Sequence, residues 1–421
     1  MTPLKGVQWR HAFLSGDSAW SVGPDGTPAP GGGPNSGAIL AIPAAEERQI
    51  ELAITPAGWV KAAMTANPTM ETKTVNGKKM TVVSFTWKGK YKVNGYVDNQ
   101  NVLEKVETWL PHAILGDMLV EASYSDYRDF SGVKFPMKIV QKEGGFPVLD
   151  LTVKEVHPNA PVNIRVPAAA QIAAAPLRLV SQQLADGVWL ITAGVQSLAV
   201  EFKDYTAVVE GATDEVRSIA VIGEVKRLVP NKPIRYVINS HHHLDHAGGL
   251  RTFVAEGATI ITADVNKPFY EKIFKLPRTL VPDKLWQNPK PATFVAVKDK
   301  YVLTDGTQSM EVHTLPDSTH ASDMLIAYVP KAKLLYTADM CNPPDFIPLP
   351  PDGPAPLLIG LIGSKQYLLD KAKLLNLDVQ QFVPAHDTRA IPLAEFQKSV
   401  EIEHEKLQRF DKANNSSSAR Y

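Results

Sequence analysis

The sequence predicts a two-domain protein of mixed α and β structure, in which an antiparallel β-rich domain with a helix precedes an α/β domain. The chain has 421 residues, which exceeds the usual size of one domain. Residues 71–166 contain short β-rich runs separated by turn residues, whereas the chain after residue 176 alternates apolar strands with helical periodicity. The segment 158–176 is rich in Pro and Ala and has no strong periodicity, so we place the boundary there. The predicted domains are 1–170 and 176–421.

Composition and charge exclude several classes of protein. Lys plus Arg and Asp plus Glu both number 44, so the net charge is zero and there is no electrostatic basis for nucleic-acid binding. No stretch approaches the ~18–20 apolar residues of a membrane span. The first twenty residues lack the pattern of a signal peptide. A single cysteine, Cys341, excludes an intrachain disulfide framework and a thiolate zinc finger.

The N-terminal domain is expected to be a curved antiparallel meander with one packed helix. Residues 22–46 are rich in Gly, Pro and Ala and are interpreted as a loop or strap. Thr55 and Pro56 suit the N-cap and the first position of a helix. Turn pairs such as Asn76-Gly77 separate the β-rich runs. The predicted core of this sheet includes four aromatic residues: Trp87, Trp109, Phe130 and Phe135.

The C-terminal domain is expected to feed strands into loops and then into helices. Three consecutive strands are predicted at Val188–Thr192, Leu198–Phe202 and Ala207–Glu210. Residues 214–228 have helical spacing, and further strands are predicted at Ile234–Ile238 and Thr259–Thr262 with a helix at 249–255 between them. Residues 381–383 are predicted as a short strand, and residues 393–410 as a closing helix.

The densest chemical signal follows the predicted strand Ile234–Ile238, where the sequence HHHLDHAGG contains His-x-His-x-Asp-His. Residues two apart on an extended segment point the same way, so His241 and His243 can converge on one metal ion. Asp245 and His246 come as the chain turns into a helix and can face a second ion. Imidazole nitrogen and carboxylate oxygen suit zinc, and also iron or manganese. His242 points away from its neighbours and is interpreted as a structural residue.

This motif after an apolar strand resembles the hallmark of the metallo-β-lactamase superfamily, and the resemblance covers about residues 180–411. It implies an αββα sandwich for the C-terminal domain. It also implies three more ligands in the family's order. These are His320 in the segment THASD, Asp339 at the end of LLYTAD, and His386 in FVPAH.

Two alternatives to these implied ligands are weighed. His313 competes with His320, but it lies in the predicted strand EVHTL, whereas family ligands lie in the loop after it. Cys341 competes with Asp339, because thiolates bind zinc well. Asp339 is preferred because it stands at the strand end.

The resemblance implies a binuclear site with two Zn²⁺ ions, for which iron or manganese are alternatives. The implied ligands of the first metal are His241, His243 and His320, and those of the second are Asp245, His246 and His386. Asp339 is the implied bridge, with a hydroxide as second bridge. Asp245 is also the predicted catalytic residue, because it can orient the nucleophile or shuttle a proton.

The function predicted from this site is hydrolysis of a carbonyl-centred bond in a lactone, ester or amide. Aromatic residues between 266 and 289 and the proline-rich segment after Asp339, with Phe346 and Ile347, predict a partly apolar substrate pocket. The alternatives are a phosphodiesterase and an iron-dependent oxidoreductase of the same superfamily, such as a persulfide dioxygenase. A carrier or binding protein is the alternative that is not an enzyme.

The N-terminal pattern is similar to the curved sheets of bacterial lipoprotein-carrier-like periplasmic proteins. A lid, a homodimerisation surface or a binder of apolar material are the roles considered for this domain. The two-part layout resembles bacterial metallo-hydrolases that are exported, which favours a mature periplasmic or secreted form over a cytoplasmic one.

Overall fold

The computed structural model describes residues 11–22, 28–30, 42–171, 177–318, 320–341 and 363–417, and these divide into two compact units. The described residues of Trp9–Ala175 and of Leu276–Pro282 form the N-terminal unit. Those of Pro176–Lys275 and Asp283–Tyr421 form the C-terminal unit. A single boundary in the sequence does not fully describe this division. The segment Leu276–Pro282 belongs to the N-terminal unit, although it lies about a hundred residues after the end of the rest of that unit.

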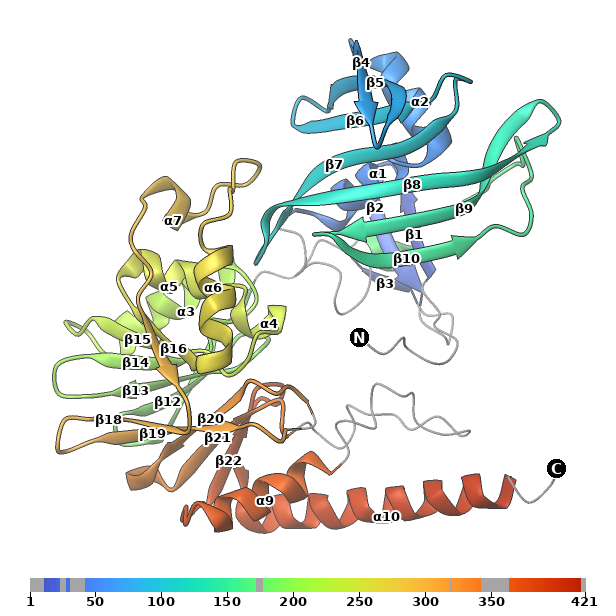
Figure 1. The fold of residues 1–421 in the computed structure, drawn as a ribbon. Helices are drawn as coiled ribbons and strands as arrows, with labels where there is room; N and C mark the ends of the chain where they lie inside the picture. Colours follow the sequence, from blue (N-terminus) through green and yellow to red (C-terminus); the bar gives the residue numbers. More distant parts are fainter. Residues whose placement is uncertain are drawn as a thin grey trace. The chain divides into compact units, whose positions relative to one another are not determined.

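The N-terminal unit is built on a seven-stranded antiparallel meander in the order β10-β9-β8-β7-β6-β5-β4 (Figure 1). Its strands are β4 (Thr69–Val75), β5 (Lys78–Trp87), β6 (Tyr91–Val97), β7 (Leu103–His112), β8 (Gly116–Phe130), β9 (Val133–Glu143) and β10 (Phe146–Thr152). A smaller sheet contains β1 (His11–Ser15), β2 (Ser18–Val22) and β3 (Pro28–Pro30). The predicted turn at Asn76-Gly77 joins β4 to β5, and both residues have positive φ, as the tight turns that match strand twist require.

Two helices, α1 (Ala44–Ala53) and α2 (Pro56–Thr65), pack on the large sheet of this unit. The predicted cap is confirmed, because the Thr55 hydroxyl accepts the backbone N–H of Gly58 and Pro56 begins α2. Trp59 of α2 lies directly against Gly95 of β6, where a Cβ would lie 2.1 Å from the indole ring. The helix can therefore pack this closely on the sheet only because residue 95 is glycine.

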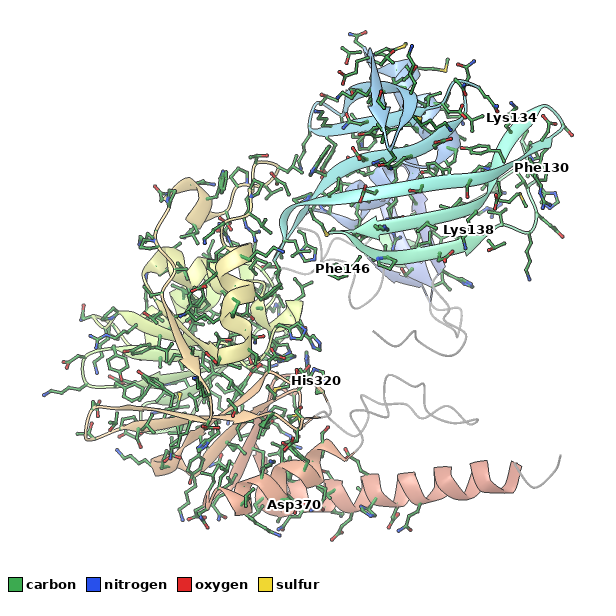
Figure 2. The ribbon with its side chains drawn as sticks, in the orientation of Figure 1. Phe130, Lys134, Lys138, Phe146, His320 and Asp370 are labelled. Atoms are coloured by element: carbon green, nitrogen blue, oxygen red, sulfur yellow. The ribbon has the colours of Figure 1, made fainter. Side chains whose placement is uncertain are left out.

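Two expectations for the N-terminal unit were wrong, and one element was missed. Helix α1 begins inside the segment interpreted as a loop, and the hairpin of β1 and β2 was not predicted. The four aromatic residues predicted as core are only partly buried, and Trp87 alone among them packs against the buried cluster. Phe130 ends β8 next to an exposed turn (Figure 2). The buried cluster instead combines Trp59, Phe85, Tyr91 and Tyr124 with aliphatic residues.

The segment Leu276–Pro282 is held in the N-terminal unit by the end of β7, the turn after it and the start of β8. The Asp117 carboxylate accepts the backbone N–H of Thr279 at 2.8 Å, the Thr279 hydroxyl at 2.6 Å and the backbone N–H of Leu280 at 3.2 Å. The Arg278 guanidinium donates to the carbonyl oxygens of His112 and Ile114. Leu280 also packs against the buried cluster, so this segment is part of the core.

The C-terminal unit contains two mixed sheets. The first has the order β11-β12-β13-β14-β15-β16-β17 and is parallel from β14 onwards. Its strands are β11 (Val180–Ala185), β12 (Val188–Thr192), β13 (Ser197–Glu201), β14 (Thr206–Val209), β15 (Ile234–Ile238), β16 (Thr259–Ala263) and β17 (Phe294–Val297). The second sheet contains β18 (Lys300–Thr304), β19 (Ser309–Leu315), β20 (Met324–Val329), β21 (Leu334–Ala338), β22 (Gln381–Pro384) and β23 (Ile391–Pro392).

Helices accompany both sheets of the C-terminal unit, whose inner faces share one apolar core (Figure 1). The helices are α3 (Glu215–Leu228), α4 (Leu244–Ala247), α5 (Leu250–Glu256), α6 (Lys267–Ile273), α7 (Lys284–Gln287), α9 (Ser364–Leu374) and α10 (Leu393–Ser417). Phe396 of α10 stacks on Phe382 of β22 with ring centroids 3.8 Å apart. Among the helices that the structure describes, none is long and apolar enough to cross a membrane.

Candidate metal centre

The His-x-His-x-Asp-His segment follows the carboxyl end of β15, where the chain turns into the short helix α4. Asn239 shapes this turn, because its buried side-chain amide donates to the carbonyl oxygen of His241 at 2.7 Å. Gly248 and Gly249 end the turn against the loop after β14. A Cβ at Gly248 would lie 1.8 Å from the Thr213 carbonyl oxygen, so only glycine fits there. The local sequence therefore fixes the direction in which the histidines point.

Three imidazole nitrogens converge in the first cluster. Nε2 of His241 lies 3.0 Å from Nδ1 of His243, and Nε2 of His320 lies 3.2 Å and 3.0 Å from these two atoms. His320 reaches this position from the loop between β19 and β20. One carboxylate oxygen of Asp339, Oδ2, lies 3.2 Å from Nε2 of His320. These four side chains form one group with metal-binding spacing.

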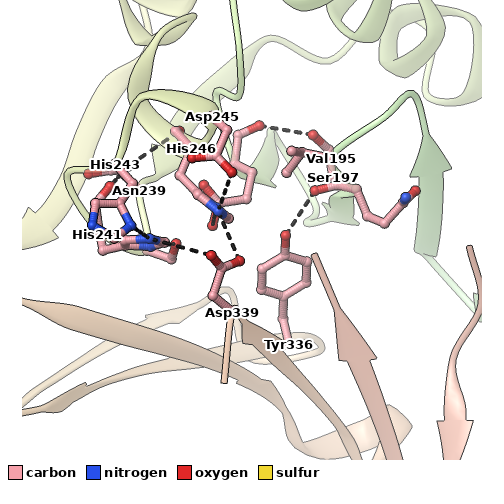
Figure 3. A network of polar contacts seen from close by, with 12 residues as sticks. Val195, Ser197, Asn239, His241, His243, Asp245, His246, Tyr336 and Asp339 are labelled. Atoms are coloured by element: carbon pink, nitrogen blue, oxygen red, sulfur yellow. Dashed lines mark hydrogen bonds and ion pairs between the residues drawn. The ribbon is translucent and has the colours of Figure 1, made fainter. Parts of the chain in front are cut away.

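The second cluster shares Asp339 with the first (Figure 3). Its other carboxylate oxygen, Oδ1, lies 2.9 Å from Nε2 of His246 and 3.0 Å from Nε2 of His386. Oδ2 of Asp245 lies 3.4 Å from the same two nitrogens. Asp339 follows β21 and His386 follows β22, two neighbouring parallel strands. The structure thus brings together all seven residues named from the sequence.

The donor set fits metal ions. A tetrahedral ion with metal–nitrogen distances of about 2.0–2.1 Å holds its ligand nitrogens roughly 3.3–3.4 Å apart. The ring nitrogens of the first cluster are 3.0–3.2 Å apart, close to that spacing. The two oxygens of Asp339 face different clusters, which is the arrangement that a bridging carboxylate needs. Nitrogen and oxygen donors of this kind suit zinc, iron and manganese.

Burial keeps His241 and His243 in the form that binds metal. Desolvation lowers the pKa of His241 well below its usual value, and the neighbouring His246 lowers it further. Desolvation and the nearby His320 lower the pKa of His243 to about 4. Both rings are therefore neutral at pH 7 and offer lone pairs without releasing a proton.

The second cluster carries charge in the metal-free protein. Burial would lower the pKa of His386, but hydrogen bonds with Asp245 and Asp339 outweigh it and raise the pKa to about 9. Burial would also lower the pKa of His246, but the carboxylates of Asp339 and Glu210 outweigh burial and raise this pKa above the usual value. Burial opposes ionisation of Asp339, yet His246 holds its pKa well below the usual range. Metal binding here must displace protons.

A buried network outside the two clusters fixes the ligand loop from behind. The Asp323 carboxylate accepts the backbone N–H of His242 at 2.9 Å and the Nδ1–H of the same ring at 2.9 Å. Asn266 donates to the same carboxylate. Tyr270 donates to the side-chain oxygen of Asn239, and the side-chain amide of Asn239 donates to the carbonyl oxygen of His241. His242 is thereby confirmed as a residue outside both clusters.

Glu210 and Ala338 stand next to the centre and were not named from the sequence as part of it. Glu210, at the end of β14, is fully buried, and its carboxylate lies 3.4 Å from Nδ1 of His246. Ala338 has φ of 48° immediately before Asp339, a left-handed conformation that non-glycine residues adopt only at a cost of ~1–3 kcal/mol. The position of Glu210 at the end of a strand was a signal that could have found it.

Several residues considered from the sequence lie elsewhere. His313 is buried in β19 with Nε2 2.9 Å from Glu311, and Cys341 is buried with a thiol pKa that desolvation raises to about 12. Neither belongs to a cluster. Tyr270 packs with Phe274 and Phe294 in an aromatic group, so it does not present its ring to a substrate. Phe346 and Ile347, expected in the pocket wall, lie outside the described residues.

Comparisons with known proteins identify the family that the C-terminal half resembles. Residues 192–386 match the family model described as the Metallo-beta-lactamase superfamily. The 2,4-dinitroanisole O-demethylase subunit alpha of Nocardioides sp. (strain JS1661) is 25% identical over 221 residues. The matched region is 51% of this chain and 59% of that protein, so the chain spans only about three fifths of the length of this relative.

Solved structures with a similar arrangement include two metallo-β-lactamases. The enzyme from Pontibacter korlensis has 16% identity and a TM-score of 0.41, over 54% of this chain and 99% of its own. FIM-1 from Pseudomonas aeruginosa, in its mono-zinc form, has 18% identity and a TM-score of 0.41, over 54% of this chain and 96% of its own. Residues 192–386, a little under half of the chain, therefore form a domain of the metallo-β-lactamase superfamily.

Proposed function

We propose that the C-terminal unit is a binuclear metal-dependent hydrolase. The observation that supports this most is the pair of clusters joined by Asp339, each with one carboxylate oxygen facing it. His241, His243 and His320 would hold one ion, and Asp245, His246 and His386 the other. Two zinc ions in these positions would lower the pKa of bound water to about 7 and polarise the oxygen of a substrate.

The proposed reaction is hydrolysis of a lactone, ester or amide. Water adds to the carbonyl carbon, the bond to the leaving oxygen or nitrogen breaks, and an acid and an alcohol or amine leave. Asp245 is the proposed catalytic residue, because its side chain is 41% exposed whereas His246 and Asp339 are buried. In this proposal Asp245 takes a proton from the attacking water and returns it to the leaving group.

A second candidate comes from the curated relative, which is named as an O-demethylase of 2,4-dinitroanisole. An aryl methyl ether plus water gives a phenol and methanol, which is again addition of water with loss of an oxygen leaving group. Nitro groups make the ring carbon that bears the methoxy group electrophilic, so that water adds there, the bond from that carbon to the methoxy oxygen breaks, and methanol leaves. The same centre could therefore serve an activated aryl ether, and this substrate belongs in any test of the chain.

The experiment combines metal analysis with a substrate panel. Protein purified without added metal is analysed for bound metal, then assayed with and without chelator on chromogenic lactones, esters, amides, β-lactams, thioesters and phosphodiesters, and on 2,4-dinitroanisole. Two zinc ions per chain and chelator-sensitive hydrolysis of a carbonyl substrate are expected. His243→Ala should abolish turnover, whereas His157→Ala, at an exposed histidine outside the centre, should not.

Other results would assign another function. One iron per chain with oxygen uptake would make the centre an oxidoreductase, and turnover of phosphodiesters alone would make it a phosphodiesterase. Turnover of 2,4-dinitroanisole alone would favour the ether substrate. If His243→Ala changed no activity of the chain, the centre would not be catalytic, and a binding role would replace the hydrolase.

A further inference from the structure

Between α6 and α7 the chain leaves the C-terminal unit and later returns to it. The segment Leu276–Pro282, called here the crossing segment, belongs to the N-terminal unit. Lys275 before it and Asp283 after it belong to the C-terminal unit. The middle of the crossing segment and the two residues that flank its base are each held by specific contacts, so the segment is more than a connection.

The turn between β7 and β8 is shaped to receive the crossing segment. In addition to the three bonds that the Asp117 carboxylate accepts, the backbone N–H of Asp117 donates to the carbonyl oxygen of Pro277 at 2.7 Å. Gly116 has φ of 67°, and a Cβ there would lie 2.3 Å from the same carbonyl oxygen, so glycine is required for this approach. Leu280 and Val281 pack against the buried cluster of the N-terminal unit. The segment is therefore held by polar bonds and by apolar packing together.

In the C-terminal unit one arginine, Arg251 of α5, holds both ends of the crossing segment. Its buried guanidinium donates two hydrogen bonds to the Asp283 carboxylate, one of them at 3.0 Å, and a third to the carbonyl oxygen of Phe274 at 3.0 Å. The guanidinium also lies 5.4 Å from the centroid of the Phe274 ring. Phe274 precedes the segment and Asp283 follows it, so this side chain closes the base of the excursion. The fork of two bonds to a carboxylate fixes direction as well as distance.

The two helices at this base also hold the ligand loop. Arg251 lies in α5, which begins directly after the glycine pair that ends the loop. Phe274 follows α6, and the fully buried Tyr270 of α6 packs on its ring. The hydroxyl of Tyr270 donates to Asn239, whose amide holds the carbonyl oxygen of His241. Because a close-packed interior transmits displacements, movement of the base would reach the ligand loop through these contacts.

We propose that the N-terminal unit regulates metal binding at the centre through the crossing segment. While Asp117 holds the middle of the segment, the positions open to Phe274 and Asp283 at its base are restricted. When the segment is released, Arg251 alone holds the base, and the ligand loop spends less time in the form that binds metal. Asp117 is thus a positioning residue, which touches no ligand and acts through α5 and α6.

The test measures the zinc affinity of the full chain by competition with a chromophoric chelator. Asp117→Ala removes the three bonds to Thr279 and Leu280 and should weaken zinc binding by about fivefold, the lower end of the usual coupling between two sites. Asp117→Asn, which keeps one acceptor oxygen, should have a smaller effect and guards against a variant that does not fold. Asp98→Ala is the matched control, because the Asp98 carboxylate accepts two backbone N–H groups at 2.9 Å in the turn between β6 and β7 of the same sheet. Its zinc affinity should equal that of wild type.

A second variant at the base separates coupling from local damage. Arg251→Lys keeps the charge but cannot hold the Asp283 carboxylate with two parallel bonds and the Phe274 carbonyl at once, so it should also weaken zinc binding. Losses at independent sites multiply, whereas residues that act through one element do not show this. The double variant Asp117→Ala/Arg251→Lys should therefore lose less zinc affinity than the product of the two single losses.

Three results would overturn this inference. They are an unchanged zinc affinity in folded Asp117→Ala, equal losses in Asp117→Ala and Asp98→Ala, and losses that multiply in the double variant. The inference rests on the metal centre of the proposed function but not on its reaction, because zinc affinity is measured without substrate. Zinc binding that depends on Asp117 in a chain that hydrolyses no substrate would retain the inference and reject only the hydrolase.

Discussion

Replacing Asp323 by alanine is expected to weaken metal binding at the first cluster without removing any ligand. Asp323 is buried and contacts no ligand side chain directly. It holds the residue between two of them, through the backbone N–H and the ring of His242, each at 2.9 Å. His241 and His243 flank that residue, so the carboxylate determines how their rings converge. Asp323→Ala removes this restraint and also removes the nearer of the two side-chain acceptors of Asn266.

The size of the effect follows from the number of bonds that are lost. Hydrogen bonds to a charged group contribute about 1.5–3 kcal/mol each, but most of that loss destabilises the folded chain with and without metal. Only the part of this loss that displaces the rings of His241 and His243 lowers the affinity for metal. Removal of such outer partners typically costs about 10–100-fold in metal affinity. This corresponds to roughly 1.4–2.7 kcal/mol.

The assay is zinc competition against a chromophoric chelator, in a His386→Ala background that leaves only the first cluster with its full donor set. Asp323→Asn, which keeps one acceptor oxygen, should fall between wild type and Asp323→Ala. Asp317→Ala is the control, because Asp317 is an exposed carboxylate on the turn before His320. A change below about threefold in a folded Asp323→Ala protein would refute the idea that this network positions the ligands.

Three further perturbations test the packing and electrostatics of the chain. Gly95→Ala should lower the free energy of unfolding by about 1–3 kcal/mol, since the new methyl group would meet the Trp59 ring, whereas Gly223→Ala, on an open helical surface, should be neutral or stabilising in the same denaturant titration. Desolvation, with the charge of Arg278, lowers the pKa of His112 to about 4, and its Nδ1 accepts two backbone N–H groups, so the ring is neutral when folded. The unfolded chain therefore binds the extra proton first, and stability should fall by up to about 1.4 kcal/mol per unit as pH drops from 6.5 to 4. Thermal unfolding of His112→Asn, which keeps an acceptor, should lose most of that dependence; an unchanged slope would contradict the assignment. Zinc affinity of the second cluster, measured in a His243→Ala background, should rise at least about tenfold per pH unit between pH 7 and 9, because His386 and His246 must both release protons; an affinity independent of pH would show that both rings are already neutral.

The local spacing of the sequence predicted four of the seven ligands of the centre. The other three ligands are distant in the sequence and could not be found from spacing alone. His241, His243, Asp245 and His246 lie within six consecutive positions at a strand end, so the period of an extended chain and the turn into the next helix suffice to direct them. His320, Asp339 and His386 are each tens of residues away, and only the resemblance to a family put them in the same place. Asp323 and Glu210 were not predicted as contacts of the centre, because their partners are set by sheet pairing.

The same physical limit applies to the fold. Strands β12 and β15 were predicted with their observed bounds, because a continuous apolar run has one interpretation in an α/β domain. The segment Leu276–Pro282 has two prolines and exposed residues, which predict a loop and nothing about the surface on which it lies. Its place in the N-terminal unit depends on Asp117, more than 150 residues earlier. Hydrogen bonds between residues so far apart in the sequence leave no pattern in the local sequence from which they could be predicted.

The arrangement of the centre implies that its scaffold forms without metal. The strands that end in ligands, β15, β21 and β22, are largely buried in the core that the two sheets share. In small zinc domains the metal supplies the folding free energy. Here apolar burial supplies it, and the strain at Ala338 is borne by that core so that Asp339 faces both clusters. Because opposite charges on Asp339, His246 and His386 already hold the second cluster together, an incoming ion replaces protons and does not have to assemble the site.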